Sequence, residues 1–314
     1  MWRLFFYLMI MLKCSISLAF NFETNKVIIH KPTYSKSTHF GYSVAGYKVD
    51  NDSWILIGAP LTQRERIQDY GHLNRIREGA IYRCRINVPN SCYMLPFDKK
   101  DDWHEVRDQH GIYYAENKTD QLLGATLQVT DDIILACAPN YRHVSRVLRH
   151  DEFRYEPTGI CYTLKDKMRK FEEHAPCRNS LWGHHRQGYC QAGFSSAIAK
   201  NDSTLFLSGP GAWYWQGMIF SIDLDNKDIR HKYPEKSGQG NEDDSYRGYS
   251  LGIGLFDDDN VEDLVVGAPR GRGSVEIFSS NFKLLHTIQG TQMGAYFGAS
   301  IIAVDLNNDK YTYF

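Results

Sequence analysis

The stretch HFGYSVAGYKVDNDSWILIGAP (residues 39–60) decides the fold, because its plan returns further along the chain. An aromatic-Gly step opens the stretch, an alternating strand and a polar turn follow, and a second apolar strand ends in Gly-Ala-Pro. Two alternating strands joined by an Asp/Asn-rich turn predict a β-hairpin. The glycine permits close approach of another backbone, and the proline ends the strand without needing an amide donor.

Four later stretches repeat this plan, the last of them only in its opening part. They are LLGATLQVTDDIILACAP (122–139), AGFSSAIAKNDSTLFLSGP (192–210), RGYSLGIGLFDDDNVEDLVVGAP (247–269) and YFGASIIAVDLNNDKYTYF (296–314). The leading glycines, Gly41, Gly124, Gly193, Gly248 and Gly298, are 83, 69, 55 and 50 residues apart. The shorter of these spacings, about 50 residues, suit a four-stranded propeller blade.

Between the repeats lie apolar segments that are each entered through a glycine and predict the next strand of the same blade. They are GAIYRCRI (79–86), GMIFSIDL (217–224) and GSVEIFSS (273–280). A β-sandwich with glycine-rich turns is the alternative, but it would not explain the repeated Gly-Ala-Pro ends. We therefore predict an all-β protein, a β-propeller with repeats starting near residues 39, 122, 192, 247 and 296.

The composition narrows the class of protein further. The net charge is −1, from 36 basic and 37 acidic residues, which argues against a nucleic-acid partner recognised through charge. Residues 1–19 read as a signal peptide, with a short basic start, an apolar run over residues 4–12 and small residues before the cleavage position. No other stretch approaches about 20 apolar residues, so we expect a chain of the secretory pathway without a membrane span of its own.

The cysteines and sequons agree with secretion. Six cysteines remain after residue 19, and an even count in an oxidising compartment indicates disulfides, although six cysteines allow 15 connectivities. We favour the nearest-neighbour pairs because they close short loops: Cys84–Cys92, Cys137–Cys161 and Cys177–Cys190. Asn51, Asn117 and Asn201 begin glycosylation sequons in polar contexts.

Together, the aromatic-Gly to Gly-Ala-Pro (FG-GAP) repeats and the local cysteine pairs resemble the N-terminal head of an integrin α subunit. WYWQG (213–217), DDSYRGYS (243–250) and QGYCQAGF (187–194) sharpen the resemblance. It covers essentially all of residues 20–314 and is closest to invertebrate laminin- or RGD-type subunits. Only 53 residues separate Pro139 from Gly193, which leaves no room for the inserted I domain of some members.

The resemblance implies a seven-bladed propeller, a cell-surface location and a cell-adhesion receptor that binds an extracellular-matrix ligand together with an integrin β subunit. Seven blades would mean that these residues form four blades and part of a fifth, as in a truncated subunit. Asp243 matches the position that binds the ligand's arginine in RGD-binding relatives, through a charge-assisted pair, and Tyr214 matches an aromatic residue that flanks the ligand. His185, with its neighbours His184 and Arg186, replaces expected acids and favours a laminin-like or atypical ligand.

The resemblance also implies structural Ca²⁺ in loops on the face away from the ligand. Calcium takes six to eight oxygen ligands from alternating positions of a tight turn. In LFDDDNVED (255–263), an acid is missing at the first position, Leu255, and in the fifth repeat Tyr313 replaces the closing acid. The expected ligands are the side chains of Asp257, Asp259, Asp263, Asp305, Asn307 and Asp309 and the carbonyl of Val261.

Two other functions remain open at this stage. A calcium-binding FG-GAP propeller could belong to a secreted phospholipase-like enzyme, or the chain could be a non-functional truncated or decoy product. We predict no enzyme, because His104-Glu105 and His110 miss the H-E-x-x-H spacing and neither G-x-S-x-G nor a P-loop occurs.

Overall fold

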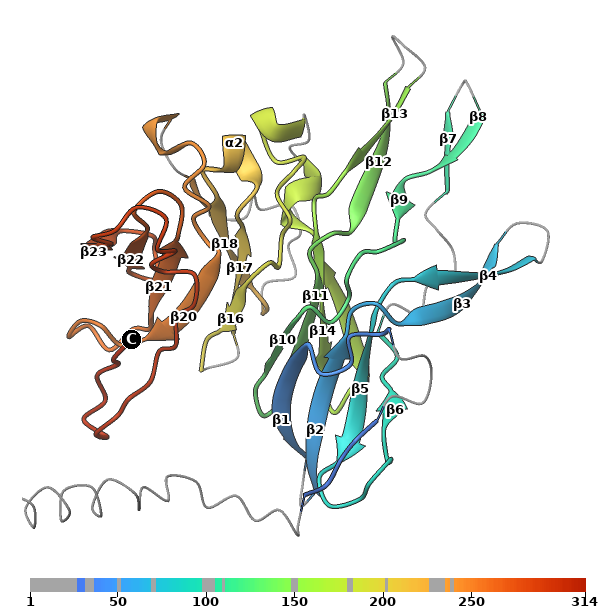
Figure 1. Cartoon of the computed structure of the whole chain (residues 1–314), viewed down its shortest axis with the longest axis horizontal. Coiled ribbons are helices and arrows are strands. Elements are labelled where there is room, and N and C mark those ends of the chain that lie inside the picture. The colour runs from blue at the N-terminus through green and yellow to red at the C-terminus, as the bar shows by residue number, and fades with distance from the viewer. Residues whose placement is uncertain are drawn as a thin grey trace, which may run out of the picture.

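A computed structural model shows the chain as a partial β-propeller whose four antiparallel sheets follow one another along an arc (Figure 1). The predicted signal peptide (residues 1–19) and the sequon asparagines Asn51 and Asn201 lie outside the described residues. The structure describes residues 27–31, 37–49, 52–68, 72–97, 105–108, 111–147, 152–179, 183–200, 203–225, 235–237 and 240–314.

Each of the four sheets is one blade of four strands, with its first strand at one edge, and the first strands of consecutive blades contact one another. The first blade comprises β1 (Ser43–Val49), β2 (Asp52–Ala59), β5 (Ala80–Arg85) and β6 (Tyr93–Met94). The second comprises β10 (Thr126–Val129), β11 (Ile134–Ala138), β14 (Ile160–Lys165) and β15 (Lys170–His174). The third comprises β16 (Ser196–Ile198), β17 (Thr204–Gly209), β18 (Met218–Asp223) and β19 (Glu235–Ser237). The fourth comprises β20 (Ser250–Gly254), β21 (Asp263–Ala268), β22 (Ser274–Phe278) and β23 (Leu284–Gln289).

The predicted hairpins and third strands are confirmed, but long insertions add strands that the repeat pattern did not predict. Hairpins form from β3 (Gln63–Gln68) with β4 (His72–Arg77), and from β7 (Glu105–Asp108) with β8 (Gly111–Tyr114). A separate three-stranded sheet contains β9 (Glu116–Asn117), β12 (Arg142–Val147) and β13 (Glu152–Glu156). In the fifth repeat, residues 296–314 contain only an isolated bridge between Val304 and Tyr313.

The hydrophobic core lies between consecutive blades. Alternate residues of each second strand face opposite neighbours, so Ile134 packs toward the first blade and Leu135 toward the third. A strand covered on both faces needs an apolar residue at every position, which explains the continuous apolar runs ILACA and LVVGA. The same division recurs at Phe206, which packs with the fourth blade, and Leu207, which packs with the second.

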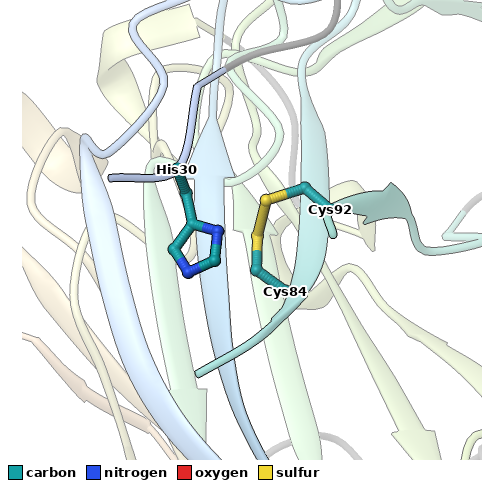
Figure 2. A group of neighbouring side chains, drawn as sticks. All are labelled: His30, Cys84 and Cys92. Atoms are coloured by element: carbon teal, nitrogen blue, oxygen red, sulfur yellow. A yellow bond between two sulfur atoms is a disulfide. The ribbon is translucent and has the colours of Figure 1, made fainter. Parts of the chain in front are cut away.

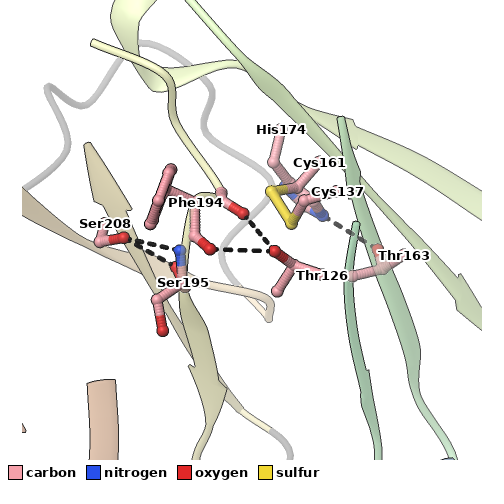
Figure 3. Close-up of a disulfide and its surroundings, with 9 residues drawn as sticks. Thr126, Cys137, Cys161, Thr163, His174, Phe194, Ser195 and Ser208 are labelled. Atoms are coloured by element: carbon pink, nitrogen blue, oxygen red, sulfur yellow. Dashed lines mark hydrogen bonds between the residues drawn. A yellow bond between two sulfur atoms is a disulfide. The ribbon is translucent and has the colours of Figure 1, made fainter. Parts of the chain in front are cut away.

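A hydroxyl two residues after the leading glycine fastens each blade to the next repeat. Ser43 Oγ donates to the carbonyl of Gly124 (2.7 Å), and Ser250 Oγ donates to that of Gly298 (2.7 Å). In the second blade, Thr126 Oγ1 donates to the carbonyl of Gly193 (2.8 Å), as Figure 3 shows. In the third, Ser195 Oγ accepts from the amide of Leu251 (3.0 Å). In three of the four blades the repeats are thus joined by the same hydroxyl-to-glycine-carbonyl bond, and in the third blade by a bond from the Leu251 amide to the hydroxyl.

The six described cysteines form three disulfides, Cys84–Cys92, Cys137–Cys161 and Cys177–Cys190, which are the nearest-neighbour pairs. The second links directly opposed residues of β11 and β14. It lies against the start of the third repeat (Figure 3), where a Cβ on Gly193 would come within 2.3 Å of Cys161 Sγ.

Replacing Gly193 with alanine should destabilise the propeller. Its φ of +84° is unfavourable for other residues, and the new Cβ would overlap both sulfur-bearing side chains. We expect a loss of about 2–5 kcal/mol in the free energy of unfolding, measured by urea denaturation. Gly240→Ala is the matched control, because a Cβ there meets nothing within 4 Å. Equal stability of the two variants would contradict this account.

The buried His174 should make the fold sensitive to acid. Burial lowers the pKa of His174 to about 4, and its Nε2 lies 2.9 Å from Thr163 Oγ1. The unfolded chain therefore binds this proton near pH 6.5 and the folded chain does not, so stability falls as the pH drops from about 6.5 toward 4. Urea unfolding should show wild type losing about 2 kcal/mol more than His174→Gln between pH 7.5 and pH 5.

The exposed His286 supplies the control, since His286→Gln should keep the wild-type pH dependence. A His174→Gln variant that retained the full acid sensitivity would show that another group causes it.

Candidate ligand surface and cation loops

A left-handed turn between β17 and β18 carries the expected ligand-flanking tyrosine. It is the short helical segment α2 (Ala212–Trp215), in which Trp213, Tyr214 and Trp215 have φ values of 51°, 56° and 59°. Such backbone is costly for residues other than glycine, so neighbouring groups must hold it. One stabilising contact is the hydrogen bond from the Trp213 amide to the carbonyl of Arg186 (2.6 Å).

The segment after η5 (Gly240–Glu242) binds to the other side of α2. The amide of Asp244 donates to the carbonyl of Tyr214 (3.0 Å), and the amide of Tyr246 donates to that of Trp215 (2.8 Å). Gln216 Nε2 donates to Asp243 Oδ1 (2.7 Å), which orients the carboxylate while leaving Asp243 exposed. The structure therefore brings Asp243 and Tyr214 onto neighbouring segments.

The 3₁₀ turn η4 (Gly183–His185) completes this surface. His185 Nδ1 and the Tyr214 hydroxyl form a hydrogen bond. The ring of His184 stacks on Trp215, with centroids 5.9 Å apart and planes at 11°. We call residues 183–189, 212–216 and 243–246 the ligand surface; it contains all three predicted ligand residues, Asp243, Tyr214 and His185.

A buried arginine that the sequence analysis missed anchors one side of the ligand surface. Arg247 donates to both carboxylate oxygens of Glu276 on β22 (2.6 and 2.9 Å) and to Glu242 (2.7 Å). Burial lowers the pKa of Arg247, but the hydrogen bonds and charges of the two glutamates outweigh burial and raise it. Because Arg247 and Glu276 are 29 residues apart, no local pattern could have revealed the pair.

At the other end of the blades (Figure 1), the fourth repeat gathers three carboxylates. One oxygen each of Asp257, Asp259 and Asp263 lies within 4.8 Å of the others. Asp263 is fully buried; its Oδ2 accepts from the amide of Phe256 (3.0 Å), and its Oδ1 has no partner among the described residues. Burial raises the pKa of Asp263, and the charges of the other two acids raise it further. A divalent cation fits these residues, because it would pair the orphaned oxygen and offset the repulsion.

The fifth repeat's loop is arranged differently. Asp305 accepts from the amides of Asn308 (2.7 Å) and Lys310 (3.0 Å), and Asn307 Nδ2 donates to Asp309 Oδ2 (2.8 Å). Asp305 is half-buried and Asn307 and Asp309 are exposed, and within the described chain no third carboxylate joins Asp305 and Asp309 within 4.8 Å. The structure brings the expected residues together but leaves their oxygens bonded to their own loop.

The two loops nevertheless touch. The amide of Thr312 donates to the carbonyl of Leu255 (2.9 Å), and the Tyr311 hydroxyl donates to Asp258 Oδ1 (2.6 Å). Val261, expected to offer its carbonyl, lies in the turn where its amide donates to Asp259 Oδ1 (2.7 Å).

Of the sequon residues, Asn117 is half-buried, and its Oδ1 accepts from the amide of Thr119 (2.9 Å).

Comparison with known proteins gives a consistent result. The chain is 34% identical to integrin alpha-PS2 of Drosophila melanogaster over 313 residues, which span 88% of this chain and 22% of that protein. It is 33% identical to integrin alpha-8 of Mus musculus, over 93% of this chain and 28% of that protein. It is 32% identical to integrin alpha-V of Gallus gallus, over 96% and 29%. The chain thus spans about a quarter of the length of these curated relatives.

Other comparisons add little. No protein-family model matches the chain. The solved structure "Crystal structure of the eukaryotic initiation factor" matches 77% of this chain and 53% of that chain, at 12% identity and a TM-score of 0.32, which is too low to indicate a shared fold. Among the described residues, no helix is long and apolar enough to cross a membrane.

Calcium should stabilise the chain through the fourth repeat's loop. We expect millimolar Ca²⁺ to raise the melting temperature of wild type and to have little effect on Asp263→Asn, which removes the buried charge. Differential scanning calorimetry with Ca²⁺ and with EDTA measures this. Asp131→Asn, a change at an exposed aspartate, should leave the calcium response intact. An unchanged response in Asp263→Asn would place the bound cation elsewhere.

Proposed function

We propose that this chain, a segment of the integrin α family, forms part of a cell-adhesion receptor head that binds an extracellular-matrix ligand together with an integrin β subunit. Its relatives over about nine tenths of its length are integrin α subunits, including one from an invertebrate, and are not enzymes. They favour neither the phospholipase-like enzyme nor the decoy product. The proposal includes transit through the secretory pathway to the cell surface.

The ligand-binding part of this proposal rests on one observation: three separate segments of the chain meet at the ligand surface. Asp243 presents an exposed carboxylate that Gln216 holds in place, and Tyr214 is 40% exposed beside it. A carboxylate with a fixed orientation can take a ligand arginine or lysine through charge-assisted hydrogen bonds. The aromatic rings of Tyr214 and Trp215 offer additional contact area that needs little further ordering.

The surface also carries features that oppose a simple arginine pocket. His185 is hydrogen-bonded to Tyr214, and Arg186 is exposed on the same turn. A guanidinium on the ligand would approach this fixed positive charge, whereas a laminin-type ligand need not present arginine there. We therefore keep both ligand classes, RGD-type and laminin-type, within the proposal.

The cation part of the proposal assigns structural Ca²⁺ to the loops at the opposite end of the blades. Asp257, Asp259, Asp263 and the Val261 carbonyl would hold one ion, and Asp305, Asn307 and Asp309 would contribute to another. The orphaned, buried oxygen of Asp263 supports the first of these more strongly than any feature supports the second. Bound calcium would supply a positive charge that ties the turn together; it would have no part in ligand contact.

Coexpression tests the proposal directly. The tagged chain, expressed with an integrin β subunit, should co-precipitate with it and appear on the cell surface, and the cells should adhere to laminin or to an immobilised RGD peptide. Asp243→Ala should weaken adhesion by about tenfold to a hundredfold, the value of one charge-assisted hydrogen-bonded pair. Surface pairing with the β subunit should not change, because Asp243 is exposed.

Asp166→Ala is the control, since Asp166 is an exposed turn residue of the second blade. A folded, secreted chain that never associates with a β subunit would refute the receptor function. Normal pairing with full adhesion of Asp243→Ala would refute only the ligand assignment.

A further inference from the structure

A histidine lies beside the disulfide of the first blade. One ring nitrogen of His30 and the sulfurs of Cys84 and Cys92 all lie within 4.8 Å of one another, and the imidazole faces the sulfur–sulfur bond (Figure 2). Both ring nitrogens are shielded from water and have no hydrogen-bond partner among the described residues. Buried polar groups are usually paired, so this imidazole needs an explanation. Metal binding does not supply one, because sulfurs bonded to each other are not thiolate ligands.

The three disulfides differ in their access to solvent. Cys137, Cys161, Cys177 and Cys190 are fully buried, and the Cys137–Cys161 bond is packed between two blades (Figure 3). In the first blade, Cys84 is fully buried but Cys92 is partly exposed. Cys92 is therefore the one cysteine of the three described disulfides with partial exposure, and it is the end at which a thiol from solution would attack.

Opening this disulfide would also disturb little of the fold. It spans eight residues between β5 and the short outermost strand β6, which pairs with β5 at Tyr82 and Arg83. The loop in between is held independently by Ser91, whose Oγ accepts from the Arg85 amide (2.9 Å) and donates to the Val88 carbonyl (2.7 Å). Of the two cysteines, only Cys84 lies on one of the blade's three inner strands, and Cys92 lies in the loop before β6.

We propose that Cys84–Cys92 is an exchange-active disulfide, a site of reversible modification by small thiols, with His30 as its proton carrier. A thiol RSH gives its proton to the neutral imidazole, and the thiolate attacks Cys92 Sγ. The Cys92–Cys84 bond breaks, a mixed disulfide forms between Cys92 and R, and Cys84 leaves with the electron pair. The imidazolium returns the proton to Cys84. A second RSH then releases RSSR and leaves Cys92 as a thiol, so that two electrons pass from two thiols to the protein disulfide.

The environment of Cys84 explains why a proton carrier is needed there. Cys84 lies in an apolar cluster with Ile57, Ala80 and Tyr82. A thiolate formed in such surroundings would be a buried, unpaired charge and hence a poor leaving group. Protonation by an adjacent imidazole removes that cost at the moment when the bond breaks. The ring nitrogens of His30, which have no hydrogen-bond partner among the described residues, would thereby gain a role.

The test uses the full, oxidised chain with reduced glutathione as the thiol. Samples are quenched with N-ethylmaleimide over time, and each cysteine is quantified by peptide mass spectrometry. Cys84 and Cys92 should be labelled first, with Cys92 passing through a glutathione adduct. In His30→Ala the rate should fall roughly tenfold to a hundredfold, as for loss of one general acid–base group, and added imidazole should restore part of it.

His286→Ala, at an exposed histidine on β23, should react like wild type. Thermal unfolding of each variant separates a chemical effect from a loss of stability, and His30→Gln provides a variant with a polar side chain that cannot carry the proton. Simultaneous reduction of all three disulfides, earlier reduction of a buried pair, or an unchanged rate in both His30 variants would overturn the proposal.

Discussion

The fold depends on a contact in which the backbones of successive repeats touch. A Cβ on Gly58 would lie 2.1 Å from the carbonyl oxygen of Gly124, and one on Gly267 would lie 1.8 Å from that of Gly298. These distances leave room for hydrogen only. The approach brings the carbonyl of the leading glycine to the hydroxyl of Ser43 or Ser250 in the preceding repeat. The sheets are thereby fixed at a distance that buries both faces of each second strand.

The ligand surface follows from this arrangement of blades. With the third and fourth blades held side by side, α2 and the segment after η5 are close enough for backbone hydrogen bonds at Tyr214, Trp215 and Gln216. Those bonds, with the ion pairs of Arg247 to Glu276 and Glu242, offset the cost of three consecutive left-handed residues. The positions of Asp243 and Tyr214 are therefore set by packing between blades, and a ligand would find them already arranged.

The sequence predicted the features that recur and missed those that arise from single long-range contacts. The leading glycines and closing prolines revealed all four blades, and each leading glycine has a positive φ that glycine tolerates best. The sheet of β9, β12 and β13 lies in insertions that share no pattern with the other repeats. The Arg247–Glu276 pair and the approach of His30 to a disulfide join distant parts of the chain. In residues 296–314 the repeat pattern was present, yet only the Val304–Tyr313 bridge formed.

The two acidic loops show why counting ligands in a motif is less informative than asking where each oxygen lies. By motif, each loop lacks one acid: Leu255 occupies the first position in the fourth repeat, and Tyr313 occupies the closing position in the fifth. In the fold, Asp305 is satisfied by amides of its own loop, so it gains little from a cation. Asp263 is fully buried beside two other acids, and one of its oxygens has no hydrogen-bond partner in the described part of the chain. Burying a carboxylate in this way is unfavourable unless it is neutralised, by a proton or by a bound cation. Proton uptake satisfies one acid, while a divalent ion attracts all three, so the fourth repeat's loop has a stronger physical demand for calcium than the fifth.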